Sequence, residues 1–324
     1  MSSENADRPS AIAMAAFAAV VVLGGSNAIA VKQTVGELAP FWGAALRFLA
    51  AGLVMFLLVV VTRRAVPTGK SLRGAVLYGL LGFSAAYGFL YTGIQEVPAG
   101  TVMVLVALTP LFTFGLAILH RQESFRVQGL MGALLALAGV TVVVLDQVDA
   151  DVPIGSMLLV ILGTMAIAES GVVAKAIPKS DPLATNAVAM LAGGLVLFLL
   201  ALITSESLNL PTTGTTWLAT GYLVLFGSVA MFALYLFTLQ RWTASAVSYV
   251  TLLMPLVTIV LGAILFDERI SPTFVLGSAV ILAGVYLGAF FSLRPHKTVE
   301  SLPECLPLHT ERTAMAGEPS QDSG

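Results

Sequence analysis

The chain has 324 residues, of which 57% are hydrophobic and 10% are charged, and its mean hydropathy is +0.93. A soluble domain carries about 25% charged residues, so this composition excludes an ordinary water-soluble domain and predicts an integral membrane protein. The formal net charge of −2 argues against a polyanionic partner such as a nucleic acid.

Apolar runs long enough to cross a membrane follow one another along the chain. A crossing takes about 20 residues of helix, and backbone groups in lipid must be hydrogen-bonded within their own segment. The runs lack the alternation that is typical of transmembrane β-strands. We therefore predict ten transmembrane helices, approximately over residues 11–31, 40–62, 74–95, 98–119, 127–145, 153–176, 182–204, 215–239, 243–266 and 271–293.

Basic residues gather in alternate connections between these spans. With a cytoplasmic N-terminus, the outer connections hold only Lys32 and Arg269, and most acids lie beside them. Because inner connections of membrane proteins are enriched in Lys and Arg, we predict that both termini are cytoplasmic. The inner connections then hold Arg8, Arg63, Arg64, Lys70, Arg73, Arg121, Arg126, Lys175, Lys179, Arg241, Arg294 and Lys297. We place this multi-pass protein in the bacterial cytoplasmic (inner) membrane.

The chain matches itself when it is shifted by about 145 residues. Pro110 then falls on Pro255, and Lys32 falls on Lys175 at a shift of 143. A repeat of five helices is odd, so the second unit enters the membrane from the opposite face, which predicts two inverted repeats. We divide the chain into a cytoplasmic N-terminal tail (1–10), a first repeat (11–146), a second repeat (153–293) and a disordered cytoplasmic tail (294–324).

Several stretches resemble the EamA-type family of the drug/metabolite transporter superfamily. They are GGSNAIAVK (24–32), Pro40 and Arg47, and the two Pro…Glu…Gly…AGV blocks that the repeat superimposes. The resemblance covers residues 11–292. It implies two EamA-type repeats of five helices, export from the cytoplasm, and a central cavity between the halves. Members of such families carry amino acids, other metabolites or drugs.

Glu169 lies in the cytoplasmic half of the sixth predicted span, in an otherwise apolar run. Acids within the membrane usually face a cavity or a partner, which makes Glu169 a candidate substrate-pathway residue. It would exchange a proton during transport or pair with a cationic substrate. A carboxylate that reaches the inner interface or hydrogen-bonds a neighbouring helix is the competing interpretation.

Other polar side chains are candidates for the substrate pathway. At the shift of 143, Ser26 falls on Glu169 and Asn27 on Ser170, so the first and sixth spans carry polar groups at related positions. Tyrosines of the third, eighth and ninth spans would offer aromatic faces with polar tips. Hydrogen bonds between helices and ordinary packing explain the same residues equally well. The pathway candidates are Glu169, Asn27, Ser26, Ser170, Tyr87, Tyr91, Tyr235 and Tyr249.

A further group has a predicted gating or structural role. Pro110 and Pro255 lie in the middle of the fourth and ninth spans, where a proline removes an N–H and frees a carbonyl. The freed carbonyls would face a cavity or accept hydrogen bonds from nearby threonine hydroxyls. Arg47 would snorkel to the interface or pair with an acid such as Glu37, with direct substrate binding as the alternative. The group is Arg47, Pro110, Pro255, Thr109, Thr113 and Thr258.

The function predicted from these features is a secondary transporter that exports a small metabolite or drug by alternating access, with proton coupling left open. The alternatives are a facilitative, uncoupled carrier and, more remotely, a membrane-embedded enzyme or lipid-handling protein. We expect no enzyme activity, cofactor, metal site, catalytic residue or nucleotide, because nucleotide-binding and catalytic motifs are missing and the chain has one cysteine and three scattered histidines. The expected partners are a small-molecule substrate and the lipid bilayer.

Overall fold

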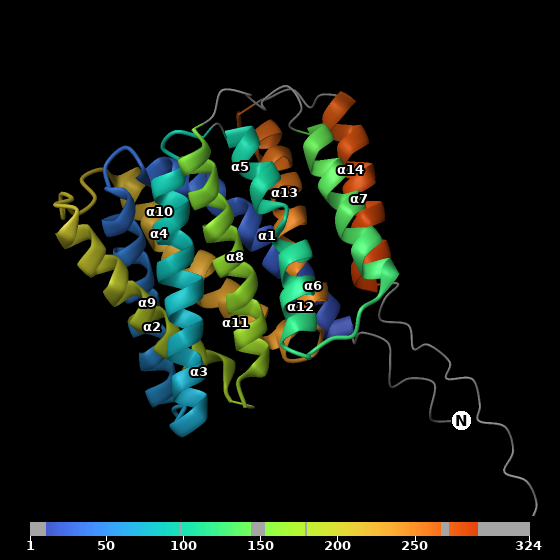
Figure 1. Cartoon of the computed structure of the whole chain (residues 1–324). Helices are drawn as coiled ribbons and strands as arrows, with labels where there is room; N and C mark the ends of the chain where they lie inside the picture. Colours follow the sequence, from blue (N-terminus) through green and yellow to red (C-terminus); the bar gives the residue numbers. More distant parts are fainter. Residues whose placement is uncertain (1–10, 98, 144–152, 179, 267–271, 291–324) are drawn as a thin grey trace, which may run out of the picture. The chain divides into compact units, whose positions relative to one another are not determined.

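The structure is a computed structural model that describes residues 11–97, 99–143, 153–178, 180–266 and 272–290 (Figure 1). The elements in chain order are α1 (Ala11–Thr34), α2 (Pro40–Val61), α3 (Gly69–Gly79), η1 (Leu80–Ala85), α4 (Ala86–Gly93), α5 (Ala99–Val106), α6 (Thr109–Leu119), α7 (Val127–Val143), α8 (Ile154–Ala176), α9 (Pro182–Ile203), α10 (Gly214–Val224), η3 (Leu225–Ala230), α11 (Met231–Leu239), α12 (Ala244–Ser248), α13 (Val250–Phe266), α14 (Pro272–Val285) and η4 (Tyr286–Phe290). The described residues belong to one compact unit. The predicted tails, 1–10 and 294–324, lie outside them.

The prediction of an all-helical membrane protein is confirmed over the described residues. Nine helical segments in this part of the chain are long and apolar enough to cross a membrane. The fifth predicted span corresponds to α7, an apolar helix of 17 residues, and its last two predicted residues fall outside the described ranges. Many leucine and valine side chains on these helices are exposed, as expected for surfaces that face lipid.

Helices α2 and α9 begin and end in the same way, at positions related by a shift of 142. They begin at Pro40 and Pro182, where the fixed φ and missing N–H of proline suit a first turn. They are followed by Arg63 and Ser205, which have positive φ values of 53° and 56°. The next backbone N–H closes each helix end with a 2.9 Å hydrogen bond to a carbonyl of the last turn. The repeat therefore extends to the local signals that begin and end helices.

Two π-helical turns, η1 and η3, interrupt the third and eighth predicted spans, and the sequence analysis did not anticipate them. Each has six residues, and a shift of 145 superimposes them, with Gly82 on Gly227. A Cβ on Gly82 would lie 3.0 Å from the Ser170 hydroxyl, and one on Gly227 would lie 2.1 Å from the Asn27 amide oxygen. Both glycines thus allow a polar side chain of the other half to approach the π turn.

Contacts between helices follow the repeat. Helix α1 packs on α10, η3 and α11 of the second half, and α8 packs on α3, η1 and α4 of the first. Helix α2 packs on its counterpart α9, and α7 lies beside its counterpart α14 at one edge of the bundle (Figure 1). Each repeat therefore sends its first helix into the other half, which places the interior of the bundle between the two halves.

Aromatic side chains fill the centre of the described bundle. The rings of Phe48 and Phe83 are 4.8 Å apart, and Phe232 lies 4.8 Å from Phe83 at an interplanar angle of 68°. Tyr87 meets Phe48 edge-to-face at 4.9 Å. Edge-to-face pairs contribute about 0.5–1.5 kcal/mol beyond the area they bury. The cluster joins the third and eighth spans through α2.

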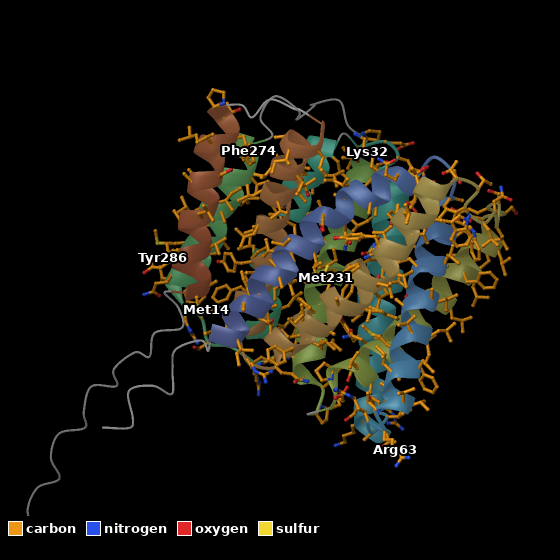
Figure 2. The ribbon with its side chains drawn as sticks, turned by 180° about the vertical axis from the view of Figure 1, so that it is seen from behind. Met14, Lys32, Arg63, Met231, Phe274 and Tyr286 are labelled. Carbon is orange, nitrogen blue, oxygen red and sulfur yellow. The ribbon has the colours of Figure 1, made fainter. Side chains whose placement is uncertain are left out.

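The bundle has two ends, which serve as reference points below. Figure 2 shows Lys32 and Phe274 at one end, and Met14 and Arg63 at the other. We call these the Lys32 end and the Arg63 end.

Candidate functional site

A cavity of about 360 Å³ lies between the two halves of the bundle. Its wall comes from α1, α2, the third span and α6 of the first half, and from α8, α11, α12 and α13 of the second half. The volume falls in the range of small-molecule sites, about 300–1,000 Å³. Most of the wall is apolar or aromatic, with a few polar groups among it. This cavity is the candidate site.

The structure brings eight of the predicted site residues to the cavity wall. They are Asn27, Ser170, Tyr87, Tyr91, Tyr235, Arg47, Thr109 and Thr113. Tyr87 and Tyr91, four residues apart, form an edge-to-face pair with ring centroids 5.5 Å apart. The wall also holds Tyr78 and the aromatic pair Phe83 and Phe232, which the sequence analysis did not single out. Of these three, only Tyr78 could have been predicted from the sequence, because it is a tyrosine that precedes Tyr87 and Tyr91 on the same span.

The other predicted site residues do not line this cavity, namely Glu169, Ser26, Tyr249, Pro110, Pro255 and Thr258. Ser26 shares a 2.5 Å hydrogen bond with the Tyr222 hydroxyl, which links α1 to α10. The Tyr249 hydroxyl is buried and donates to the Gly129 carbonyl at 3.2 Å. Ser26 and Tyr249 therefore each join two helices, and a pathway role for them stays a prediction.

The two prolines occupy different local settings. The fourth predicted span is interrupted between α5 and α6, so Pro110 lies in the first turn of a new helix, where a proline costs little. The hydroxyl of Thr109 donates to the Val106 carbonyl at 2.6 Å across the interruption. Helix α13 instead continues through Pro255. The hydroxyl of Thr258 donates to the Gly25 carbonyl of α1 at 2.7 Å, so it joins two spans.

Arg47 is buried, with 5% of its surface exposed, and it lines the cavity. Its Nε donates to the Ser228 hydroxyl at 2.7 Å, and its Nη2 donates to the Gly227 carbonyl at 2.7 Å. Asn27 donates to the same carbonyl at 3.2 Å. The π turn η3 provides these acceptors because its wider hydrogen-bonding pattern leaves Gly227 free to bind side chains. Arg47 thus binds a helix of the other half, and Glu37, named as one possible partner, does not bind it.

The cavity continues toward the Lys32 end. A second cavity of about 310 Å³ is lined by the end of α1, the start of α2 and the end of the third span. It shares Val31, Arg47 and Tyr91 with the central cavity. The central cavity and the second cavity therefore adjoin at these three residues.

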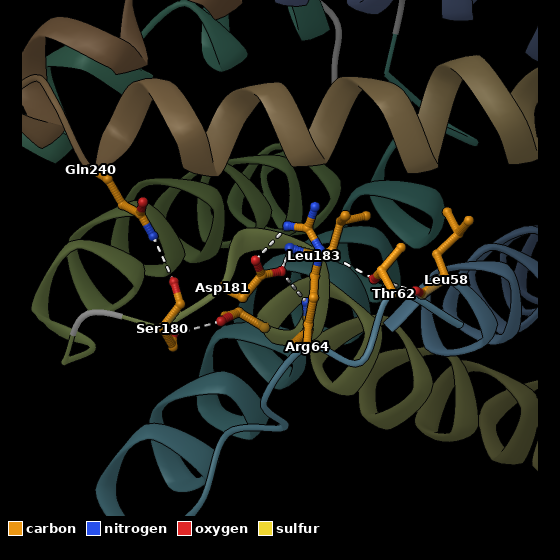
Figure 3. A network of polar contacts seen from close by, with 9 residues as sticks. Leu58, Thr62, Arg64, Ser180, Asp181, Leu183 and Gln240 are labelled. Atoms are coloured by element: carbon orange, nitrogen blue, oxygen red, sulfur yellow. Dashed lines mark hydrogen bonds and ion pairs between the residues drawn. The ribbon is translucent and has the colours of Figure 1, made fainter. Parts of the chain in front are cut away.

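The Arg63 end is closed by polar contacts. The Lys175 ammonium donates to the carbonyls of Leu239 and Trp242, both at 2.7 Å, and so joins α8 to the end of α11. Figure 3 shows the neighbouring contacts, in which Gln240 donates to the Ser180 carbonyl at 3.0 Å and Arg64 pairs with Asp181 at 2.5 Å.

A hollow of about 480 Å³ at this closed end is lined by residues that include Ala174, Lys175, Leu239 and Arg241. None of its lining residues belongs to the central cavity. The hollow and the central cavity are therefore distinct, and Lys175 belongs to the wall of the hollow.

Glu169 pairs with His120 at the end of α6. Its Oε1 lies 3.0 Å from His120 Nε2, and its Oε2 is buried with no hydrogen-bond partner among the described residues. Gln122 strengthens the same junction by donating to the Val172 carbonyl at 2.9 Å. Glu169 does not line the cavity, although the adjacent Ser170 does. A pathway role for Glu169 stays a prediction.

Glu37, in the connection after α1, binds the connection before α10. Its carboxylate accepts hydrogen bonds from the backbone N–H of Thr212 at 2.6 Å and from the hydroxyls of Thr213 at 2.6 Å and Thr216 at 2.7 Å. These bonds, with that to the Thr213 hydroxyl as the largest cause, lower the pKa of Glu37 from 4.5 to about 2. The ionised carboxylate therefore holds the two halves together at the Lys32 end.

We expect this contact to weaken in acid. Because the folded-state pKa lies below the ordinary value, the stabilisation by Glu37 is complete above about pH 4.5 and is lost as the pH falls toward 2. The melting temperature of Glu37→Gln in detergent should lie below that of the wild type at neutral pH, and the two should converge between pH 4.5 and pH 2. A difference that stays constant through this range would contradict the assignment.

Comparison with known proteins adds three findings. Residues 11–145 and 154–290 match the EamA-like transporter family. The chain is 28% identical over 273 residues to the uncharacterized inner membrane transporter YedA of Escherichia coli (strain K12), which covers 84% of this chain and 89% of YedA. It is 27% identical over 293 residues to a probable amino-acid metabolite efflux pump of the same strain, which covers 87% of this chain and 95% of the pump.

The fold also matches a solved crystal structure. The TM-score is 0.74 at 19% sequence identity, and the match covers 87% of this chain and 97% of the other. At this identity the likeness shows the fold alone.

Proposed function

Because this chain belongs to the EamA-like transporter family and is a membrane transporter, we propose that it is a secondary transporter that exports a small metabolite or drug by alternating access. In this proposal the repeats 11–146 and 153–293 are inverted five-helix units that together make ten transmembrane helices. The termini and the Arg63 end face the cytoplasm, the Lys32 end faces the outside, and the bilayer is the bacterial inner membrane. One relative, a probable amino-acid metabolite efflux pump, supports export of a small metabolite.

The observation that carries the proposal is the contrast between the two ends of the cavity. The central cavity shares three wall residues with the cavity at the Lys32 end and none with the hollow at the Arg63 end, where Lys175 binds the Leu239 and Trp242 carbonyls. In this proposal the protein is therefore open toward the Lys32 end and closed toward the Arg63 end. Alternating access requires a second state in which the closed end opens and the open end closes. The repeat supplies a matching set of residues at the open end.

Lys32 is the counterpart of Lys175, and Ile94 and Val97 are the counterparts of Leu239 and Trp242 at a shift of 145. Lys32 is exposed and makes no hydrogen bond or ion pair within the described residues. A lysine ammonium binds well to the free carbonyls at a helix C-terminus. In the second state, Lys32 therefore closes the Lys32 end by binding the carbonyls of Ile94 and Val97, and Lys175 releases its own.

The Glu169–His120 pair is the proposed proton site. Proton uptake by the carboxylate removes its attraction to His120 and loosens the contact between α8 and α6. Helix α8 also carries Lys175 and Ser170, so a loosened α8 would affect both the closed end and the cavity wall. Protonation at Glu169 would in this way couple a proton to the change of state.

We expect a pH gradient to drive transport by the wild type and to leave Glu169→Gln unaffected. One pH unit corresponds to about 1.4 kcal/mol per proton, or roughly a tenfold accumulation ratio. The measurement is flux into proteoliposomes with an imposed gradient, for a panel of amino acids, organic acids and cationic drugs. Glu96→Gln, which alters an acid outside the pair, is the matched control and should keep the gradient dependence.

The other possible results of this flux measurement would lead to different conclusions. A Glu169→Gln protein that still follows the gradient would show that another group carries the proton. If both proteins transport and both ignore the gradient, the protein is a facilitative carrier. One observation favours this alternative: Glu169 does not line the described cavity. Absence of flux for the whole panel would count against the transport proposal. The enzyme alternative has no support from the family or from the named relatives, which are transporters.

A further inference from the structure

We propose that the central cavity selects an organic monoanion with an aromatic or bulky apolar body, and that Arg47 is the residue that recognises the anionic group. This inference rests on the proposed transport function, because it names the substrate class of the same cavity. It goes beyond the sequence expectation for Arg47, which was a gating or structural role.

The charge of the cavity wall is the first reason. Arg47 is the one charged residue among the described residues that line the cavity. The ion pairs in the described part of the chain are Arg64–Asp181 and His120–Glu169, so the Arg47 guanidinium has no carboxylate partner there. A buried charge inside a membrane protein is costly unless it is paired or hydrogen-bonded. A bound anion would provide the missing countercharge.

The geometry of the guanidinium is the second reason. Its Nε and Nη2 are held by Ser228 and Gly227, and Phe48 lies against it, with Cζ 5.0 Å from the ring centroid. These contacts fix the plane of the group. Its Nη1 donates no hydrogen bond within the described residues. A guanidinium has five N–H donors, so a fixed plane with unused donors is suited to a carboxylate.

Arg47 also lies between two cavities. It belongs to the walls of both the central cavity and the cavity at the Lys32 end. A substrate whose carboxylate binds there would extend its body into the central cavity. The guanidinium therefore serves as the recognition point between the centre and the Lys32 end.

The aromatic wall is the third reason, because it fits the rest of the molecule. Tyr87 and Tyr91 form one edge-to-face pair, and Phe83 and Phe232 form another. The hydroxyl of Tyr78 is buried on the same wall and has no hydrogen-bond partner among the described residues. An apolar or aromatic body would pack against the rings, and a polar substituent would satisfy the Tyr78 hydroxyl.

The same wall disfavours cationic substrates. No acidic side chain lines the described cavity, so an ammonium group would find no carboxylate and would face the positive charge of Arg47. A zwitterion such as an amino acid would gain at its carboxylate and lose at its ammonium. Monoanions therefore rank above zwitterions, and zwitterions above cations.

The test uses probes of one shape and different charge. They are 3-phenylpropionate (anion), 3-phenylpropionamide (neutral), phenylalanine (zwitterion) and 3-phenylpropylammonium (cation), titrated calorimetrically against the full-length protein in nanodiscs. We expect the wild type to bind the anion about 10- to 100-fold more tightly than the amide, the gain of a charge-assisted hydrogen bond. Equal affinities for anion and amide, or no binding of the anion, would overturn the proposal.

Two variants separate recognition from structure. Arg47→Gln should lose the preference for the anion and bind the amide as before, whereas Arg47→Lys should keep part of the preference. If Arg47 only holds the π turn, Arg47→Gln will weaken both probes by the same factor, which would contradict recognition. Should Arg47→Gln fail to fold, the wild-type charge series and Arg47→Lys still decide the question.

Flux measurements distinguish this inference from the proposed function. If proteoliposomes transport neutral or cationic panel compounds, while 3-phenylpropionate is neither transported nor inhibitory, the protein is a transporter and the substrate class is wrong. If no compound is transported, the transport proposal fails whatever the probes bind. Selective transport of the anion, lost in Arg47→Gln, would support both.

Discussion

Replacing Gly79 with leucine should prevent the bundle from assembling, whereas leucine at Gly115 should leave the protein folded. A Cβ on Gly79 would lie 2.2 Å from the Ala189 carbonyl oxygen and 2.7 Å from the carbonyl carbon and Cα of the same residue. These are backbone atoms of α9, which cannot rotate away as a side chain can. A Cβ on Gly115, on an exposed helix face, would meet nothing within 4 Å.

The cost at Gly79 should exceed that of ordinary overpacking. Extra methylenes in a packed core cost about 1–3 kcal/mol when neighbouring side chains can adjust. Here the neighbouring atoms belong to the backbone of α9. An ideal Cβ built on Gly193 of α9 would likewise lie 2.6 Å from the Gly79 carbonyl oxygen. The contact also lies directly before η1, which forms part of the cavity wall.

The measurement is the yield of monodisperse protein in size-exclusion chromatography, followed by the melting temperature of what is recovered. Gly79→Ala should give folded protein with a lowered melting temperature, and Gly79→Leu should give little or none. Gly115→Leu controls for added bulk in a membrane helix. A Gly79→Leu protein that melts like the wild type would show that α3 and α9 separate without loss of stability.

Removing the Lys175 ammonium should open the Arg63 end. Lys175→Met keeps the length of the side chain and loses the two hydrogen bonds to the carbonyls of Leu239 and Trp242. Hydrogen bonds of charged groups are worth about 1.5–3 kcal/mol each, so the balance between states should move by roughly 10- to 100-fold or more. Transport should fall about tenfold, because a cycle biased to one state turns over slowly.

Accessibility of a reporter cysteine tests the change of state directly. With Cys305 replaced by serine, Ser248→Cys places a thiol on the cavity wall. An impermeant maleimide should reach it from the Lys32 end in the wild type, and from the Arg63 end as well in Lys175→Met. Lys32→Met should be labelled faster than the wild type from the Lys32 end, because the second state, which closes that end, is destabilised.

Lys70→Met, which changes an exposed lysine at the start of α3, is the control and should label like the wild type. If Lys175→Met also labels like the wild type, Lys175 is not the gate. If Lys32→Met labels like the wild type while Lys175→Met does not, the gate at the Lys32 end uses residues other than the counterpart of Lys175.

The element boundaries show how far sequence reasoning reached. Spans predicted over 40–62 and 182–204 correspond to Pro40–Val61 and Pro182–Ile203. These ends depend on local chemistry: the length of an apolar run, a proline in the first turn, and a residue that takes positive φ after the last. The membrane class and the transporter family also follow from short local patterns, because apolar runs and the Pro…Glu…Gly…AGV blocks recur along the chain.

The hydrogen-bond partners of polar residues could not be predicted from the sequence. Arg47 was predicted to snorkel to the interface or to pair with an acid such as Glu37. Arg47 instead binds the π turn η3, and Glu37 binds threonines of another connection. Glu169 binds His120. In each case the partner lies far away in the sequence and is chosen by which helices cross, so spacing along one helix carries no information about it.

The sequence by itself determined the membrane class, the ends of the helices and the internal repeat, because each depends on hydrophobic length and on residues adjacent in the chain. Only the tertiary structure decided that the third and eighth spans contain π turns, that Arg47 lines the cavity without a carboxylate partner among the described residues, and that Lys175 binds the Leu239 carbonyl at the Arg63 end. Whether a helix forms α or π hydrogen bonds, and which acceptors a buried charge binds, depend on the backbone of another helix. These contacts form across the interface between the two halves.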